Sequence, residues 1–382
     1  MIHRNHNDML EFHKFRPDLL RYLDNHGELL PADHKMPEGK TALIVRWGAI
    51  GDMVFASPLP RLLKEQGYYV VVNTQRQGVQ VLQHNPYIDE FWFQERGTID
   101  PFKMHLYIEK LKEGFDKVVD LTQSIEREIL EIADDDQFKR VDDLDVNYID
   151  HTLSKAGLDT RGINGELYFT EGEEQATQDF LSEFKDRFIV LVCLLGSSIH
   201  KAYPWWQFVF NDTTLYRDIP ELLTITTGDE WARLLDWEHP QNLQGATSNL
   251  SIRKSLLLAK HSDLVIGPET GIVNGAGCFD TPKICLLTHS SRNNLAAYWK
   301  NDYSLESPAE CSPCHKMVYS REQCEVDPNT ATSKCISQIK PDVVAKRIKE
   351  VYKEWKRKKY RAIITPSQYH EERKSCQPLV IL

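Results

Sequence analysis

Short apolar runs alternate with amphipathic stretches along most of the chain, in two blocks. A short continuous apolar run predicts a strand buried on both faces, whereas apolar residues every three or four positions predict a helix. The expected strands are Leu43–Val45, Tyr69–Val72, Glu90–Phe93, Lys117–Leu121, Phe188–Leu195, Leu222–Thr226, Leu264–Ile266 and Lys283–Leu287. The expected helices include Gly78–His84, Lys103–Lys112, Trp205–Phe210 and Ile252–Lys260. This alternation predicts a doubly wound parallel α/β sheet in each half of the chain.

The segment from Leu43 to Leu63 combines a predicted strand, a glycine-bounded loop and the start of a helix. Gly48 and Gly51 shape the loop, because they allow the backbone to turn sharply and to approach a ligand. Asp52 then follows the carboxyl end of the strand, where open α/β sheets bind their ligands. An aspartate here also suits a helix cap, and the residues alone favour neither role. The loop lacks the glycine pattern of dinucleotide sites.

The loop after the strand Phe188–Leu195 carries groups that suit a phosphate. Gly196, Ser197 and Ser198 can offer backbone N–H groups and hydroxyls, and Lys201 can neutralise negative charge. A lysine at this point is also compatible with an ordinary surface position. The loop becomes evidence for a phosphate site only together with a second loop of the same kind.

The loop after the strand Leu264–Ile266 is that second loop. Its Gly-Pro-Glu-Thr-Gly turn enters a helix of small residues, with Thr270 and Gly271 at the helix N-terminus, where anions bind. Glu269 could accept hydrogen bonds from sugar or ribose hydroxyls. The alternative is that glycine and proline only shape a tight turn. Two such loops favour a nucleotide-diphosphate site, and two α/β halves favour a ligand in the cleft between them.

The length and the net charge of the chain limit the classes of protein to which it can belong. The 382 residues exceed one ordinary domain, and a formal net charge of −10 argues against a surface devoted mainly to nucleic acid. No apolar run reaches the roughly 20 residues that span a bilayer, and the first residues lack the apolar core of a secretory signal, so a cytoplasmic location is expected. The eight cysteines are then expected to be thiols or metal ligands rather than disulfides.

The order of these motifs resembles glycosyltransferase family 9, the type that transfers heptose from ADP-heptose to lipopolysaccharide. The resemblance rests on GAIGDMVFASP, on the spaced G-S-S-x-x-K-x-x-P-W, on Gly-Asp-Glu after a strand, on the Glu-Thr-Gly turn, and on CSPC followed by two more cysteines. It covers residues 41–355, and the order of the motifs is specific although no single motif is.

The resemblance implies the GT-B architecture: two Rossmann-like domains with a cleft between them, a donor site in the C-terminal domain, an acceptor site facing the N-terminal domain, and a final helix that crosses back. It also implies inverting sugar transfer without a catalytic metal, with Asp52 as the general base that deprotonates the acceptor hydroxyl. Lys201 falls on the donor-phosphate lysine. The other positions assigned to the donor are Gly196, Ser197, Glu230, Leu250, Glu269, Thr270, Gly271 and Asn274.

Three departures from the family pattern fall in the donor loops. Glu269 replaces the usual aspartate, Asn274 stands where histidine is common, and Thr288-His289-Ser290-Ser291 replaces Phe-Gly-Pro-Thr. Phosphate binding is still expected, whereas the sugar and the base of the nucleotide remain open.

Two groups of residues have the spacing of metal ligands. Asp143-Leu144-Asp145 has the D-x-D spacing of some sugar transferases, although an ordinary acidic surface loop is the favoured interpretation. Four late cysteines begin with a C-x-x-C pair, which suits structural zinc, but the later spacings fit less well. We therefore expect no metal, with these thiols as the candidates for a zinc site: Cys311, Cys314, Cys324 and Cys335.

The C-terminal segment combines cations with apolar residues at helical spacing. Val344, Ile348, Val351 and Trp355 predict a basic helix docked by its apolar face, and its cations could contact an anionic acceptor or the inner face of a membrane. A second, short helix is expected around Leu19–Leu23. The expected domains are an extension (1–40), an acceptor domain (41–170), a donor domain (171–340) and the basic crossover helix with its tail (341–382).

The sequence thus predicts a nucleotide-sugar glycosyltransferase that needs no cofactor besides its donor and acts on a hydroxyl acceptor, with a lipopolysaccharide core or another surface or lipid-linked glycan favoured. A hydroxylated base in nucleic acid is the alternative acceptor, which salt-sensitive DNA binding through Lys356–Lys359 would favour. A non-catalytic sugar-nucleotide-binding protein is the alternative from another class. A dehydrogenase is disfavoured because the dinucleotide glycine pattern is missing.

Overall fold

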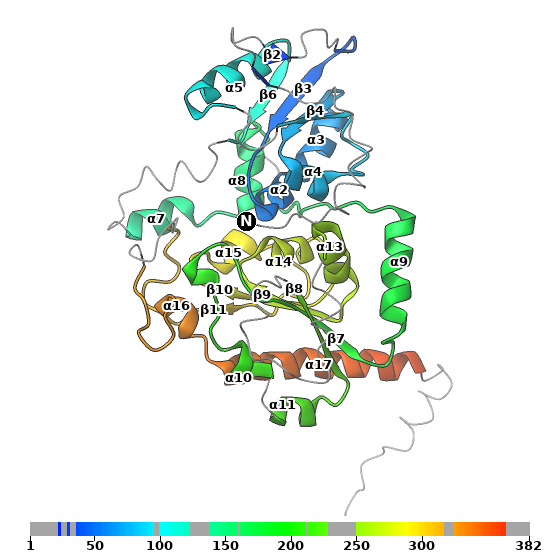
Figure 1. The fold of residues 1–382 in the computed structure, drawn as a ribbon, viewed down its shortest axis with the longest axis vertical. Helices are drawn as coiled ribbons and strands as arrows, with labels where there is room; N and C mark the ends of the chain where they lie inside the picture. The colour runs from blue at the N-terminus through cyan, green and yellow to red at the C-terminus, as the bar shows by residue number, and fades with distance from the viewer. Residues whose placement is uncertain are drawn as a thin grey trace, which may run out of the picture.

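The computed structural model describes residues 22–23, 29–30, 36–94, 99–122, 137–158, 161–210, 213–227, 250–316 and 324–363. Figure 1 shows their two parallel sheets, with the N-terminal sheet above the C-terminal one. A separate antiparallel pair joins β1 (Tyr22–Leu23) and β2 (Leu29–Leu30). The short helix expected around Leu19–Leu23 is therefore wrong at its last two residues, which pair as a strand.

The N-terminal sheet has the strand order β5-β4-β3-β6. Its strands are β3 (Thr41–Val45), β4 (Tyr69–Thr74), β5 (Glu90–Phe93) and β6 (Lys117–Asp120). The helices in this half are α2 (Ile50–Ala56), α3 (Leu59–Glu65), α4 (Arg76–Leu82), α5 (Met104–Lys112, after a 3-10 turn at Pro101–Lys103), α7 (Gln137–Leu144) and α8 (Tyr148–Lys155). α2 and α3 are separate helices because Pro58, at the N-cap of α3, has no N–H with which to continue α2.

β3 is apolar along its whole length because both of its faces are covered. Leu43 and Val45 pack against Leu111 of α5 and its neighbours. Ala42 and Ile44 point to the opposite face. They belong to the hydrophobic cluster that also includes buried residues of α2, α3 and α4. Successive side chains of a strand point to opposite faces, so a strand between two helix layers has no polar alternation.

The C-terminal sheet has the strand order β11-β10-β9-β7-β8. Its strands are β7 (Phe188–Cys193), β8 (Leu222–Thr227), β9 (Leu264–Pro268), β10 (Lys283–Leu287) and β11 (Leu305–Glu306). The helices in this half are α9 (Glu171–Ser182), α10 (Trp206–Phe210), α11 (Thr213–Asp218), α13 (Ile252–His261), α14 (Gly271–Ala276), α15 (Arg292–Leu295), α16 (Lys334–Ser337) and α17 (Pro341–Ile363), with a 3-10 turn at Ile199–Lys201.

The predicted doubly wound α/β fold is confirmed, and each expected strand ends within two residues of its predicted position. β11 was not expected, because two residues carry no periodicity. The strand order reverses between β3 and β6 in one sheet and between β7 and β9 in the other. Ligands of open α/β sheets bind outside the carboxyl ends of the strands at these reversals. The loops after β3, β7 and β9 are therefore the expected positions of a ligand site.

The basic helix α17 is confirmed and packs on the C-terminal sheet. Val344, Ile348 and Val351 are buried in the cluster on the outer face of that sheet, and Lys349 Nζ lies 2.6 Å from an oxygen of Asp218. In Figure 1, α17 runs along the side of the C-terminal sheet that faces away from the N-terminal sheet. No helix in the described ranges has the length and apolar character to cross a membrane.

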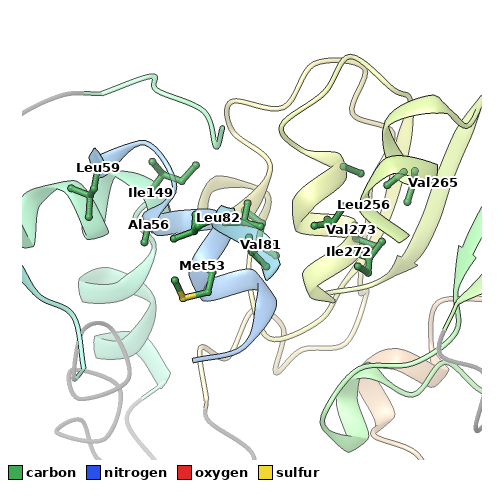
Figure 2. Packing of buried hydrophobic residues seen from close by; sticks show 14 of the residues in the cluster. Met53, Ala56, Leu59, Val81, Leu82, Ile149, Leu256, Val265, Ile272 and Val273 are labelled. Atoms are coloured by element: carbon green, nitrogen blue, oxygen red, sulfur yellow. The ribbon is translucent and has the colours of Figure 1, made fainter. Parts of the chain in front are cut away.

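One hydrophobic cluster continues from the N-terminal half into the C-terminal half. Figure 2 shows Met53 and Leu82 on one side of this cluster and Leu256, Ile272 and Val273 on the other. α2 packs on α14, and α4 packs on α13. The relative position of the two sheets is therefore held by buried apolar surface, which is a dominant favourable term in protein association.

Arg253 of α13 adds a polar contact to the same boundary. Its guanidinium pairs with Glu173 and donates to the carbonyl oxygen of Gln80, at 3.2 Å, and to that of Gln83, at 3.4 Å. Burial alone would raise the pKa of Glu173, but Arg253 and the N–H and hydroxyl of Thr170 outweigh it and lower that pKa to about 2. The side chain of Arg253 is only 5% exposed, so water has little access to its guanidinium.

Replacing Arg253 by methionine is expected to lower the free energy of unfolding by about 3–5 kcal/mol, because it leaves a half-buried carboxylate and several carbonyls without their partner. Urea unfolding measures the loss. The matched control is Lys300→Met, since Lys300 and its partner Asp280 are both exposed and a surface pair contributes about 0–1 kcal/mol. Equal effects of the two substitutions would contradict the role of Arg253.

The Glu173 carboxylate should also make stability depend on pH. Its pKa in the folded state, about 2, lies below the ordinary value of 4.5, so its contribution is present above pH 4.5 and is lost as the pH falls toward 2. Glu173→Gln should therefore be less stable than the wild type at neutral pH, and the difference should shrink between pH 4.5 and pH 2. A difference that is constant over this range would show that the charge of Glu173 contributes nothing.

Candidate functional site

A cavity of about 750 Å³ lies where the loops after β3, β7, β9 and β10 meet. This volume is within the range of about 300–1,000 Å³ that is usual for ligand sites. The loops come from both sheets, so the cavity lies between the two halves of the chain. The residues predicted from the sequence that line it are Gly51, Asp52, Gly196, Ser197, Ser198, Lys201, Glu269, Thr270, Gly271 and Asn274.

Asp52 lies in the first turn of α2, where contacts to Ala49 and Arg46 orient it. One oxygen accepts from the N–H of Ala49 at 2.7 Å, so the predicted helix cap is present. The other lies 3.0 Å from the guanidinium of Arg46, which is buried and also donates to the carbonyl oxygen of Leu121 at 2.7 Å. About a quarter of the side chain remains exposed, and it lines the cavity. The two interpretations of Asp52 are therefore compatible, because the cap and Arg46 orient a carboxylate that faces the cavity.

The glycines of the loop after β3 permit close packing rather than only a turn. A Cβ on Gly48 would lie 2.5 Å from a carboxylate oxygen of Asp52. A Cβ on Gly51 would lie 2.7 Å from the side-chain nitrogen of Asn274, across the boundary between the two halves. A Cβ on Gly271 would lie 2.4 Å from the Cβ of Ile50 and 2.9 Å from the backbone nitrogen of Gly51. The starts of α2 and α14 thus approach so closely that Gly51 and Gly271 have no room for a side chain.

Gly271→Ala is expected to push the two halves apart and to lower stability by about 1–3 kcal/mol, because the added methyl meets backbone that cannot rotate away. Ligand-induced thermal shifts should shrink as well, since the cavity lies at the same boundary. The control is Gly172→Ala in α9, where a Cβ has no neighbour within 4 Å and the substitution should be neutral or slightly stabilising. Wild-type stability of the Gly271 variant would show that the contact is not tight.

The loop after β7 holds Lys201 against its own backbone. The N–H of Gly196 donates to the carbonyl oxygen of Lys201 at 3.0 Å, and Leu195 pairs with Ala202. A Cβ on Gly196 would lie 2.6 Å from the Cβ of Lys201, so glycine lets the lysine side chain pack over the loop. Lys201 and the exposed Ser197 line the cavity. The loop therefore presents a positioned ammonium and a hydroxyl at the strand reversal of the C-terminal sheet.

Glu269 does not have the role expected from the sequence. It is 3% exposed, and one oxygen accepts from the N–H of Thr288 at 2.5 Å, the hydroxyl of Thr288 at 3.1 Å and the N–H of Ser290 at 3.3 Å. The other oxygen lies against Nδ1 of His289. Burial alone would raise the pKa of Glu269, but His289, Lys201 and His200 hold it well below its ordinary range. Its carboxylate is occupied by the loop after β10, so it is not available to read sugar hydroxyls.

Two of the departures from the family pattern are thus one structural feature. Glu269 follows β9, and residues 288–291 follow β10, and the longer glutamate reaches the backbone of that loop. Thr288 also donates from its hydroxyl to the carbonyl oxygen of His200 at 3.1 Å. Hydrogen bonds consequently connect the loops after β7, β9 and β10 to one another.

The remaining predicted residues have mixed positions. Thr270 caps α14, where its hydroxyl accepts from the N–H of Val273. Asn274 is 8% exposed, and its side-chain oxygen is buried without a partner among the described residues, so it could accept a hydrogen bond from a ligand. Leu250 is half-buried in the core and does not line the cavity. Glu230 lies outside the described residues.

The predicted metal ligands are not arranged to bind a metal. Asp145 accepts from the hydroxyl of Ser291, and in the part of the chain that the structure describes no group of three or more His, Cys, Asp or Glu side chains could hold an ion. A hydrogen bond from Cys335 lowers the pKa of the Cys324 thiol to about 6, so these two thiols are close to each other. The seven described cysteines are free. The geometry thus gives no support to a zinc site at Cys311, Cys314, Cys324 and Cys335.

Sequence reasoning missed several residues of the cavity. Arg46 stands one residue beyond β3, and a single arginine in an apolar context carries no periodic signal. Tyr148 of α8 brings its hydroxyl within 3.0 Å of the Ser290 hydroxyl, and both line the cavity, as does His289. The only available signal for His289 and Ser290 was their departure from the family pattern.

Comparison with known proteins supports the fold. The sequence matches no family model and no curated protein. Among solved structures, it is similar to a family 9 glycosyl transferase from Veillonella parvula DSM 2008, with a TM-score of 0.59, 14% identity, and coverage of 84% of this chain and 100% of that one. ADP-heptose lipopolysaccharide heptosyltransferase II of E. coli gives a TM-score of 0.56 at 13% identity, with coverage of 83% of this chain and 99% of that one. The iron-containing dodecameric glycosyltransferase TibC of enterotoxigenic E. coli H10407 gives a TM-score of 0.55 at 12% identity, with coverage of 84% of this chain and 78% of that one. The chain therefore has the fold of the family 9 glycosyltransferases, as the order of its motifs predicted.

Proposed function

We propose that the protein is an inverting glycosyltransferase that moves a sugar from a nucleotide-diphosphate donor to a hydroxyl acceptor. The observation that carries this proposal is the cavity itself, in which a carboxylate from one sheet faces a lysine and two small-residue loops from the other. The fold alone would not be sufficient, because one fold can host unrelated functions.

The C-terminal half would hold the donor. Lys201 is the cation for the diphosphate, and the backbone and hydroxyls of Ser197 and Thr270 offer further donors beside it. Asn274 would accept a hydrogen bond from a sugar hydroxyl through its buried side-chain oxygen. As the bond between the anomeric carbon and the diphosphate breaks, negative charge grows on the phosphate oxygen, and Lys201 stabilises it.

The N-terminal half would supply the base. Asp52 takes the proton from the acceptor hydroxyl as that oxygen attacks the anomeric carbon. The contacts to Ala49 and Arg46 hold the carboxylate in place as it receives the proton. A single displacement with base and leaving group on opposite sides of the carbon inverts its configuration.

For the acceptor, we propose a surface or lipid-linked glycan. α17, which carries the cations of the C-terminal segment, runs along the outer side of the C-terminal sheet in Figure 1, and none of its described residues lines the cavity. These cations would therefore serve a peripheral contact with an anionic surface, at the cytoplasmic face of a membrane, rather than hold the acceptor at the site of transfer.

A thermal-shift panel of sugar nucleotides and free nucleoside diphosphates tests the proposal, because a ligand that binds only the folded state raises the melting temperature. The expected result is a shift with one base and its sugar conjugates. Donor hydrolysis or transfer by the same protein would separate an enzyme from a non-catalytic binder. Transfer that survives dialysis against EDTA would support a reaction without a metal. No shift with any member of the panel would contradict the proposal.

A further inference from the structure

His289 lies in the loop after β10 and lines the cavity together with Lys201. From this geometry we propose that His289 is a second phosphate-binding residue, held in place by Glu269. The inference rests on the proposed function, since it assigns a contact to the diphosphate of the same donor. It concerns a position at which this chain departs from the family pattern.

Glu269 determines which nitrogen of the ring faces a ligand. Its buried carboxylate lies against Nδ1 of His289, so Nδ1 carries the hydrogen toward the carboxylate. Nε2 is then the ring nitrogen left for the cavity, and 17% of the His289 side chain is exposed. The other oxygen of Glu269 is bound to Thr288 and Ser290, on either side of the histidine, which fixes the backbone as well as the ring.

The ring of His200 packs against that of His289. Their centroids are 4.5 Å apart at an interplanar angle of 49°. His200 is 3% exposed, and its carbonyl oxygen accepts from the hydroxyl of Thr288. His289 is therefore held by the loops after both β7 and β9, and it cannot turn from the cavity without breaking these contacts.

Among the described residues, the charged and titratable groups close to His289 include His200 and Lys201 from the loop after β7, Glu269 from the loop after β9, and His315, whose backbone N–H donates to the carbonyl oxygen of His289 at 2.8 Å. Asp145 and Arg140 act in turn on His315. Lys316 follows in sequence and also lines the cavity. Burial, and then His289 and Lys201, hold the pKa of His200 well below its ordinary value, and burial lowers that of His315 to about 4. Both neighbouring imidazoles are thus neutral above pH 5.

The ring can hold a phosphate through Nε2. An imidazolium presents an N–H at Nε2, which donates a charge-assisted hydrogen bond to a phosphate oxygen, while Nδ1 faces Glu269. Loss of the imidazole should therefore weaken phosphate binding.

Calorimetric titration with inorganic pyrophosphate at one fixed pH tests the inference on five proteins. They are the wild type, His289→Asn, His289→Gln, Lys201→Ala and His105→Gln. Asparagine keeps an N–H toward Glu269 but has no group at the position of Nε2. His105 is an exposed residue of α5 and serves as the histidine control. Protonation of pyrophosphate itself is common to all five proteins, so ratios of dissociation constants cancel it.

We expect His289→Asn to bind pyrophosphate about tenfold more weakly than the wild type, because it loses one charge-assisted hydrogen bond. His289→Gln, which places a neutral amide near the position of Nε2, should recover part of this loss. Lys201→Ala should also bind more weakly than the wild type, and His105→Gln should equal the wild type.

Two results would overturn the inference in different ways. If Lys201→Ala weakens binding but His289→Asn binds as the wild type does, the cavity binds phosphate and His289 is not a ligand of it. If the wild type does not bind pyrophosphate, or neither substitution changes its binding, the phosphate site fails together with the proposed function. Melting temperatures of the variants identify any that fail to fold, and His289→Gln then replaces His289→Asn in the comparison.

Discussion

Asp52→Asn is expected to reduce sugar transfer by about 10²–10⁴-fold, the usual contribution of a general base, while the donor still binds. An amide cannot take the proton of the acceptor hydroxyl, but it has nearly the same shape as the carboxylate. Its oxygen can still accept from the N–H of Ala49, so α2 keeps its cap. The measurement is kcat with a saturating donor, alongside the dissociation constant for that donor.

The geometry around Asp52 defines the controls for this experiment. The substitution removes the charge that pairs with Arg46, so part of any loss could come from a shifted arginine. A melting temperature close to that of the wild type, with unchanged donor binding, would exclude that cause. Asp143→Asn, which removes an exposed carboxylate outside the cavity, should be fully active. Full activity of the Asp52 variant would leave Asp52 with the role of a helix cap alone.

Lys201→Ala is expected to weaken donor binding by about 10–100-fold, because a hydrogen bond to a charged group contributes about 1.5–3 kcal/mol. The loop itself should survive, since its closure depends on the backbone bond between Gly196 and Lys201. The best ligand from the thermal-shift panel serves as the probe, and calorimetry gives the affinity. If the substitution lowers kcat more than it weakens donor binding, Lys201 acts mainly by stabilising the negative charge that grows on the departing diphosphate.

The matched control for this change is Lys300→Ala, which removes an exposed lysine remote from the cavity and should leave binding unchanged. Lys201→Arg should not restore full affinity, because the guanidinium is a planar fork and the ammonium is a compact point charge. If Lys201→Ala binds the donor as tightly as the wild type does, the phosphate site lies elsewhere in the protein. The donor half of the proposal then loses its main support.

Local patterns were sufficient for the strands and for the loops that follow them. β3 and β7 are apolar runs because helices cover both of their faces, and such a run can be read without knowing its partners. The loops after β3, β7 and β9 then fall at the carboxyl ends of parallel strands, where ligands bind. That rule placed Asp52, Lys201 and Thr270 around one cavity before any contact was known.

The interpretation of Glu269 failed because its partners lie 19 to 21 residues further along the chain. A glutamate in a loop predicts a polar contact, but its sequence does not say whether the partner is a ligand or another loop. Thr288 and Ser290 reach it only because β10 pairs with β9. For the same reason the position of α17 was not predictable, since its apolar stripe fits any apolar surface of sufficient length.

The sequence alone therefore determined the α/β class, the parallel sheets and the identity of the loops at the cavity, since these depend on periodicity and on turns of a few residues. The tertiary structure decided that Arg46 and Ala49 orient Asp52, that Gly51 and Gly271 admit the close approach of α2 and α14, and that Glu269 holds His289 instead of a sugar. These are contacts between segments far apart in the chain. Their geometry arises only when the two sheets pack, because no local rule relates one loop to another across a domain boundary.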